Sequence, residues 1–302
     1  MVSPASSAEP SGGPAADQEP QPRPPPALTR HIGFLLRRAY VLSSDCAKAC
    51  IPDDTHLREV AILALLAERQ PISQRDLGRL LLVNRSVMVK VLDTMEDKGW
   101  VVRARNPRDR RSYALRLTDG GHRALTGRLR DLSNGDDVLT ARLTSPERRS
   151  LNRALLDLLD DRDLAPIASL SEHSGYLIAQ AHHQMRRRAI ERLAPTGLHP
   201  RDVGVLNALA ENRPCSQNQL ADSLGVSPPA AVTFVDELEA SALVTRQRST
   251  SDRRVYDVQL THEGERRLQA SRAAASELEH DVTVRIGDRN DELRHLLLKL
   301  LA

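Results

Sequence analysis

The sequence of 302 residues is poor in aromatic side chains, which make up 2% of it, and it contains only three cysteines, Cys46, Cys50 and Cys215. Three cysteines at this spacing form neither the disulfide framework of a small secreted domain nor a zinc site. No apolar stretch approaches the ~18 residues of a membrane-spanning helix. Residues 1–26 lack the apolar segment of a signal peptide. These absences predict a cytoplasmic protein that does not enter a membrane.

Catalytic motifs are also missing. The sequence contains no glycine-rich phosphate loop, no Gly-x-Ser-x-Gly and no His-Glu-x-x-His. His182 and His183 are adjacent and therefore point to different sides of a helix, and no His, Cys and Asp cluster has the spacing of metal ligands. We therefore expect no enzyme activity, no cofactor and no metal.

Lysine is scarce, with four residues, so arginine supplies nearly all of the 43 basic side chains. Arginine is well suited to recognise phosphates and base edges, because its planar guanidinium donates several hydrogen bonds. The formal net charge is only +3. A surface for nucleic acid must therefore be a local patch and not the whole molecule.

An internal repeat accounts for most of the chain. Residues 56–125 align without a gap on residues 199–268, and 28 of these 70 positions are identical. The similarity extends beyond both ends, since "HIGFLLRRAY" at His31 matches "HSGYLIAQAH" at His173. Each copy is therefore one structural unit of about 130 residues.

The repeat sets the domain boundaries. We expect a disordered tail rich in proline, serine, alanine and glycine at residues 1–27, because it has little apolar surface to bury. The first domain then covers 28–160 and the second 173–302. The connection at 161–172 is short, which predicts that the two units pack closely.

Apolar periodicity and capping residues predict the same elements in both copies. In the first copy a long helix starts near Thr29 and a second covers about 54–68. Ser73 starts a short third helix, and Asn84 starts a fourth that ends near Lys98. Two strands form a hairpin, and Thr118 and Thr144 start the last two helices. The corresponding starts in the second copy include Glu172, Ser216, Ser227 and Thr261. The predicted fold is mainly α with small β wings.

Two adjacent helices followed by a basic hairpin have the order of a winged helix-turn-helix. In this arrangement the second of the two helices enters the major groove of duplex DNA. The hairpin residues 103–111 and 246–254 carry net charges of +4 and +3. We expect their arginines to contact DNA: Arg103, Arg105, Arg108, Arg110 and Arg111 in the first copy, and Arg246, Arg248, Arg253 and Arg254 in the second.

Both copies resemble MarR-type transcriptional regulators. The resemblance rests on an Asp-x-Arg, Leu-Thr and Gly pattern: Asp109, Arg111, Leu117, Thr118 and Gly121, and again Asp252, Arg254, Leu260, Thr261 and Gly264. It implies a homodimer whose first and last helices form a dimerisation platform. Because one chain holds both copies, we expect an intramolecular pseudo-dimer. Its two fourth helices would then enter successive major grooves about 34 Å apart.

The resemblance also assigns roles to single residues. Arg111 and Arg254 correspond to wing arginines that enter the minor groove, and Asp109 and Asp252 orient them. The base-reading residues would be Asn84, Arg85, Ser86 and Lys90 in the first copy, and Ser227, Ala231 and Thr233 in the second. We expect Trp100, Tyr113 and Tyr256 to pack the wings against the lobes, and Cys215 to be a packing residue.

The two copies differ where bases would be read. The fourth helix has Lys90-Val91 in the first copy but Thr233-Phe234 in the second, after a Pro228-Pro229 start that offers few donors. We therefore predict an asymmetric operator that the first copy reads more strictly. A fused chain should also bind DNA without a dimerisation step, so that its affinity does not fall on dilution.

The resemblance implies a repressor that responds to a small aromatic or phenolic acid bound between lobe and platform. Two alternatives stay open. The fold could serve as a protein-interaction module that has lost DNA binding, or Cys46 and Cys50, one helical turn apart, could sense oxidants. Further association of two chains is also left open.

Overall fold

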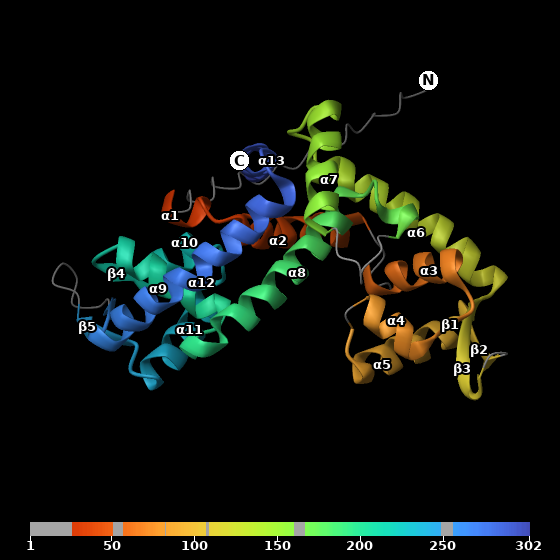
Figure 1. Cartoon of the computed structure of the whole chain (residues 1–302), viewed down its shortest axis with the longest axis horizontal. Coiled ribbons are helices and arrows are strands. Elements are labelled where there is room, and N and C mark those ends of the chain that lie inside the picture. The colour runs from red at the N-terminus through yellow and green to blue at the C-terminus, as the bar shows by residue number, and fades with distance from the viewer. Residues whose placement is uncertain (1–25, 51–56, 82, 107–108, 160–166, 249–255) are drawn as a thin grey trace, which may run out of the picture.

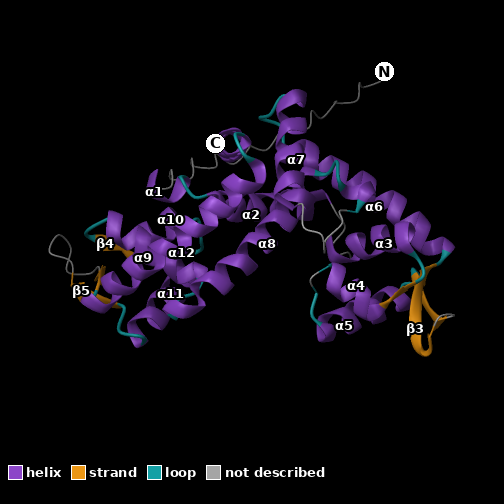
Figure 2. Cartoon of the chain, viewed as in Figure 1, coloured by secondary structure: helices purple, strands orange, loops and turns teal. Residues whose placement is uncertain are grey.

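The computed structural model describes residues 26–50, 57–81, 83–106, 109–159, 167–248 and 256–302. Two lobes lie at opposite ends of a central group of helices (Figure 1). Figure 2 shows that the described strands lie within the two lobes and that the centre is helical. Within the described ranges, no helix is long and apolar enough to cross a bilayer.

The two halves of the chain repeat one order of elements. The first half contains α1 (Pro26–Thr29), α2 (Ile32–Cys50), α3 (Leu57–Arg69), β1 (Ile72–Ser73), α4 (Gln74–Leu80), α5 (Arg85–Asp97), β2 (Val101–Asn106), β3 (Asp109–Leu117), α6 (Asp119–Leu139) and α7 (Ser145–Leu159). The second contains η1 (Ala168–Leu170), α8 (Ser174–Leu193), η2 (Ala194–Thr196), α9 (Pro200–Glu211), β4 (Cys215–Ser216), α10 (Gln217–Leu224), α11 (Pro228–Ala240), β5 (Val244–Arg248), β6 (Tyr256–Leu260), α12 (His262–Ile286) and α13 (Arg289–Leu301).

The described residues form three hydrophobic cores. One lies in lobe 1, formed by α3–α5 and β1–β3, and one in lobe 2, formed by α9–α11 and β4–β6. The third belongs to the platform, which comprises α2, α7, α8, α13 and the C-terminal parts of α6 and α12. Both halves contribute to this core, for example Leu35 and Leu36 from α2 with Leu177 and Ile178 from α8. Neither half can therefore bury its platform helices alone.

The Leu-Thr and Gly motif has a structural cause. The Thr118 side chain caps α6 by accepting from the Gly121 N–H at 3.0 Å, and its hydroxyl donates to the Gly99 carbonyl at 2.6 Å. A Cβ added at Gly121 would lie 2.1 Å from the Trp100 carbonyl oxygen, so only glycine fits there. Thr261 caps α12 in the same way. The predicted caps at these two threonines are confirmed.

Each wing has one strand more than the sequence predicted. The two-residue strands β1 and β4 pair with β3 and β6, so that Ile72 faces Leu115 and Cys215 faces Val258. Strands of two residues have no alternation of apolar and polar side chains by which to recognise them. The third strand closes each sheet against its lobe, and Cys215 is fully buried there, as predicted.

The halves exchange their first helices reciprocally. Asp136 of α6 accepts from the Gly175 N–H at 2.8 Å and lies 3.0 Å from Nδ1 of His173, at the start of α8. Glu279 of α12 accepts from the Ile32 N–H at 3.1 Å and lies 3.4 Å from Nδ1 of His31, at the start of α2. Each half therefore anchors the first long helix of the other, which is the arrangement of a pseudo-dimer within one chain.

The segments that precede these helices are exchanged as well. Leu28 of α1 is buried in the core of lobe 2, and Leu170 of η1 is buried in the core of lobe 1. The connecting segment, which the sequence suggested only as a linker, thus supplies Ile167 and Leu170 to lobe 1. Glu68 of α3 fixes η1 by accepting from the Ala168 and Ser169 N–H groups at 3.1 and 2.8 Å.

Candidate nucleic-acid interface

In lobe 1, α5 presents a polar face to solvent. Met88, Leu92 and Met95 are buried against the lobe, which leaves Arg85, Ser86, Val89 and Lys90 exposed on the first turns. The Asn84 side chain accepts from the Val87 N–H at 2.9 Å. Its oxygen therefore caps the helix, while Arg85 and Lys90 extend two cations from its exposed surface.

In lobe 2, the corresponding helix α11 carries no lysine or arginine. Ser227 and Thr233 are exposed, but the Thr233 hydroxyl donates to the Pro229 carbonyl at 3.1 Å. Ala231 is completely buried. Its proposed role in base reading is therefore wrong, because its methyl group packs into the lobe.

The wing arginines fall into two sets. The guanidinium of Arg103 lies between the carboxylates of Asp93 and Glu96, and that of Arg246 between Asp236 and Glu239. Each thereby ties its wing to the exposed helix of its lobe, and the carboxylates raise the pKa of both arginines.

Arg105 and Arg248, in contrast, are exposed, and each faces a tyrosine on the next strand, Tyr113 or Tyr256. These tyrosines are 63% and 47% exposed, so the prediction that they pack the wings against the lobes is wrong. They lie across from exposed arginines in the antiparallel register, on the outer face of the wing. Trp100 does pack against the core of lobe 1, where Nζ of Lys98 lies 4.6 Å from its ring centre.

The wing tips lie outside the described residues. This concerns Arg108, Asp252, Arg253 and Arg254, together with the side chains of Asp109, Arg110 and Arg111, whose backbone belongs to β3. Their assignment to the minor groove and to its orienting acids remains a prediction.

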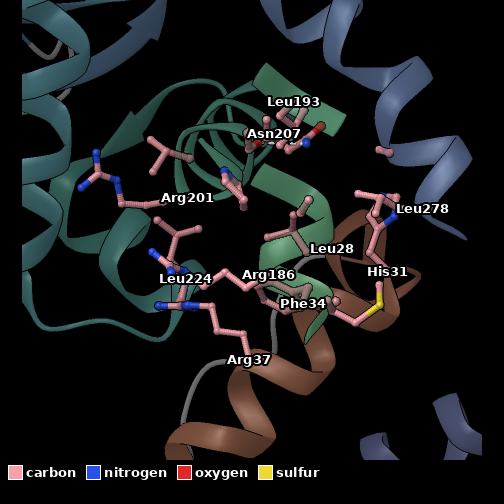
Figure 3. Close-up of a pocket in the computed structure, with 18 of the residues that line it drawn as sticks. Leu28, His31, Phe34, Arg37, Arg186, Leu193, Arg201, Asn207, Leu224 and Leu278 are labelled. Atoms are coloured by element: carbon pink, nitrogen blue, oxygen red, sulfur yellow. Dashed lines mark hydrogen bonds between the residues drawn. The ribbon is translucent and has the colours of Figure 1, made fainter. Parts of the chain in front are cut away.

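A cavity of about 290 Å³ lies where lobe 2 meets the platform (Figure 3). Its lining comes from α1, α2 and α8–α12, including Phe34, Arg37, Arg186, Asn207 and Phe234. These residues are far apart in the sequence, so no local pattern identified them.

Positive charge gathers at one end of this cavity. Burial and the neighbouring Arg38 lower the pKa of Arg37. Burial, His183, Arg37 and Arg186 lower the pKa of His182 to about 4, so this imidazole is neutral near pH 7. Its ring stacks on Tyr40 with centroids 4.7 Å apart.

The cysteines of α2 are partly buried free thiols. Burial, Cys50 and Asp45 raise the pKa of the Cys46 thiol. A raised pKa disfavours the thiolate, which is the form that reacts with oxidants. Among the described residues, no group of three or more His, Cys, Asp or Glu side chains is placed to hold a metal ion.

Two segments of the chain match the MarR family, residues 56–113 and residues 196–255. The chain is 33% identical over 132 residues to the HTH-type transcriptional repressor Rv2887 of Mycobacterium tuberculosis, covering 43% of this chain and 94% of that protein. It is also 33% identical over 130 residues to the HTH-type transcriptional regulator PecS of Dickeya dadantii, covering 41% of this chain and 76% of PecS.

Solved structures similar to this chain include the repressor CouR bound to a 23-mer DNA duplex, with 30% identity, a TM-score of 0.41, and coverage of 45% of this chain and 95% of CouR. Another is PcaV of Streptomyces coelicolor in complex with its natural ligand, with 25% identity, a TM-score of 0.40, and coverage of 44% of this chain and 94% of PcaV.

Two winged helix-turn-helix lobes on a shared helical platform define a DNA-binding transcriptional regulator and not an enzyme. The chain belongs to the MarR family and carries two MarR domains in tandem.

Proposed function

We propose that one chain binds one duplex with both lobes and represses transcription by occluding a promoter, and that a small organic anion releases it. The observation that supports this best is the pairing of the lobes. Both α5 and α11 lie on the lower side of Figure 1, away from α7 and α13, and the reciprocal contacts of Asp136 and Glu279 hold the platform between them.

The two lobes divide the recognition of DNA. Arg85 and Lys90 give lobe 1 two long donors for base edges or phosphates, whereas α11 offers Ser227 and Thr233 without a cation. Lobe 2 therefore relies on its wing, on backbone contacts and on apolar contacts with thymine methyl groups. The operator should consequently be asymmetric, with the stricter half-site under lobe 1.

The wings contribute in two ways. Arg105 and Arg248 are exposed and contact phosphates. Arg103 and Arg246 act as positioning residues, because their guanidinium groups are already engaged by carboxylates of α5 and α11. Each of them fixes the angle between a wing and the helix beside it.

The cavity under lobe 2 accommodates the effector. Phe34 and Phe234 offer an apolar surface, and Arg37 and Arg186 offer positive charge, which together suit an aromatic or phenolic acid. Such a ligand relieves repression only if it binds more tightly to the arrangement of lobes that does not fit DNA.

Selection of bound duplexes from a random pool tests the DNA-binding part. The wild type should enrich one asymmetric sequence. Lys90→Ala should relax one half-site, at a cost of about 1–3 kcal/mol per lost base contact. Thr233→Ala, the matched change at the corresponding position of α11, should leave the consensus nearly unchanged. Half-sites that tolerate substitution equally in the wild type would contradict the division between lobes.

The salt dependence separates DNA binding from the alternative of a protein-interaction module. Each phosphate contact contributes about 0.9 to the slope of log affinity against log salt concentration. Arg105→Ala and Arg248→Ala should therefore each lower the slope by about one. A shallow dependence in the wild type, without enrichment of any sequence, would favour the interaction module.

A further inference from the structure

One arginine of the platform is bonded directly to the helix-turn-helix of lobe 2. Arg37 of α2 belongs to the first half of the chain, and its Nη1 donates to the Leu224 carbonyl at 2.8 Å. Leu224 is the last residue of α10, and Gly225 follows it in the left-handed conformation, with φ of 61°. Carbonyl groups at the end of a helix carry partial negative charge, so a guanidinium stabilises them. Arg37 thus connects the platform to the turn between α10 and α11.

The same arginine lines the cavity. In Figure 3 the side chains of Arg37 and Arg186 run toward Leu224 from the ribbons of α2 and α8. Within the described part of the chain, no carboxylate lies at ion-pair distance from either guanidinium. Glu279, the acidic residue that lines the cavity, is engaged by His31 and the Ile32 N–H. An anion in the cavity is therefore attracted to the arginine end.

The equivalent positions in the other half are not cationic. Under the 142-residue offset that relates α2 to α8, Ala179 corresponds to Arg37, and Ser44 corresponds to Arg186. Asn207 of the cavity is matched by Ala64 under the 143-residue offset of the lobes. Among the described residues, Glu68 of lobe 1 accepts hydrogen bonds from the N–H groups of η1.

We propose that an aromatic organic anion binds on the lobe 2 side alone, with its acidic group on Arg37 and Arg186, and acts by drawing Arg37 away from the Leu224 carbonyl. This inference rests on the effector response of the proposed function and specifies its site and its direction. A charged acceptor makes a stronger hydrogen bond with a guanidinium than a neutral carbonyl does. Binding therefore loosens the hold on α10 and α11, and DNA binding correspondingly disfavours the anion.

Anilinonaphthalene sulfonate, an aromatic anion whose fluorescence rises in apolar sites, tests the stoichiometry on the full chain without DNA. The wild type should bind one molecule per chain. Arg37→Ala and Arg186→Ala should each weaken binding about tenfold, the loss of one charge-assisted hydrogen bond. Arg187→Ala removes an exposed arginine that does not line the cavity and should leave binding unchanged. Two equivalent sites, no binding, or no effect of the first two changes would overturn the proposal.

A second measurement tests the coupling. Fluorescence anisotropy with the selected duplex should show that anilinonaphthalene sulfonate weakens DNA binding by the wild type. At saturating probe, the loss of DNA affinity should be at least tenfold smaller for Arg37→Ala than for the wild type. Circular dichroism should show that the variant keeps its fold. An equal effect in both proteins would refute the role of Arg37. Failure to select any duplex would instead refute the DNA-binding function. The number of probe molecules bound per chain could still be measured, because that experiment uses no DNA.

Discussion

Removing the Asp136 carboxylate should destabilise the whole molecule, because this side chain joins the two halves. It is 4% exposed and accepts from the Gly175 N–H at 2.8 Å, with Nδ1 of His173 at 3.0 Å. Asp136→Ala leaves the buried His173 imidazole and the partly buried Gly175 N–H without this acceptor. A buried polar group that loses its partner costs about 1–3 kcal/mol, so we expect a loss of about 3 kcal/mol in the free energy of unfolding.

Glu279 provides the matched control, since its carboxylate anchors the start of α2 as that of Asp136 anchors the start of α8. Its side chain is 25% exposed and that of His31 is 31% exposed, so water can replace part of the lost contact. Glu279→Ala should therefore cost about 1 kcal/mol. Asp136→Asn keeps an acceptor for the Gly175 N–H and should fall between the two alanine variants.

Urea unfolding followed by circular dichroism measures these differences. With a slope of about 2–3 kcal/mol per molar urea, Asp136→Ala should lower the midpoint by about 1–1.5 M. Equal midpoints for Asp136→Ala and Glu279→Ala would refute the reasoning, because the two sites differ in burial. A midpoint unchanged by Asp136→Ala would show that the exchange of helices does not contribute to stability.

Two further predictions concern single contacts. Hydrogen bonds from Lys299 and Thr144 lower the pKa of the partly exposed Glu147 to about 2. The stabilisation that Glu147 provides between α7 and α13 is therefore complete above its ordinary pKa of 4.5 and is lost as the pH falls toward 2. A carboxyl NMR titration should show this low pKa, and Lys299→Ala should raise it; an unchanged value would contradict the pairing. Because the raised pKa of Cys46 disfavours the thiolate, we expect peroxide to have little effect on DNA affinity. The effect should be the same in the wild type and in a Cys46→Ser, Cys50→Ser variant. A loss of affinity that only the wild type shows would support the oxidant-sensing alternative.

Local chemistry made much of the fold predictable. Thr118, Thr261 and Ser216 cap helices through short-range hydrogen bonds, so they are visible in sequence as capping residues before apolar periodic segments. The repeat then placed the same elements twice. The third strand of each wing was missed because Ile72 and its neighbour pair with β3 across more than forty residues, and two residues carry no periodicity.

The candidate site was only partly predictable. Exposed Arg85 and Lys90 follow from helical spacing against Met88 and Leu92. The engagement of Arg103 by carboxylates was missed, although a signal existed: Asp93, Glu96 and Arg103 all recur unchanged at the equivalent positions of the second copy.

The cavity could not be read from any local segment. Arg37 comes from the first half of the chain, whereas its partner Leu224 and its neighbour Arg186 come from the second. Only the exchange of helices between halves brings them together. The same exchange explains why Ile167, in a segment that looks like a linker, is buried in lobe 1.

The central claim is that one chain spans two half-sites by itself. Anisotropy titrations of the selected duplex over a wide range of protein concentrations, combined with sedimentation of the complex, test it most directly. We predict one chain per duplex, a hyperbolic binding curve, and an affinity that does not weaken on dilution, because the platform core is intramolecular. Two chains per duplex, or a sigmoidal curve that reveals a dimerisation step, would contradict the account.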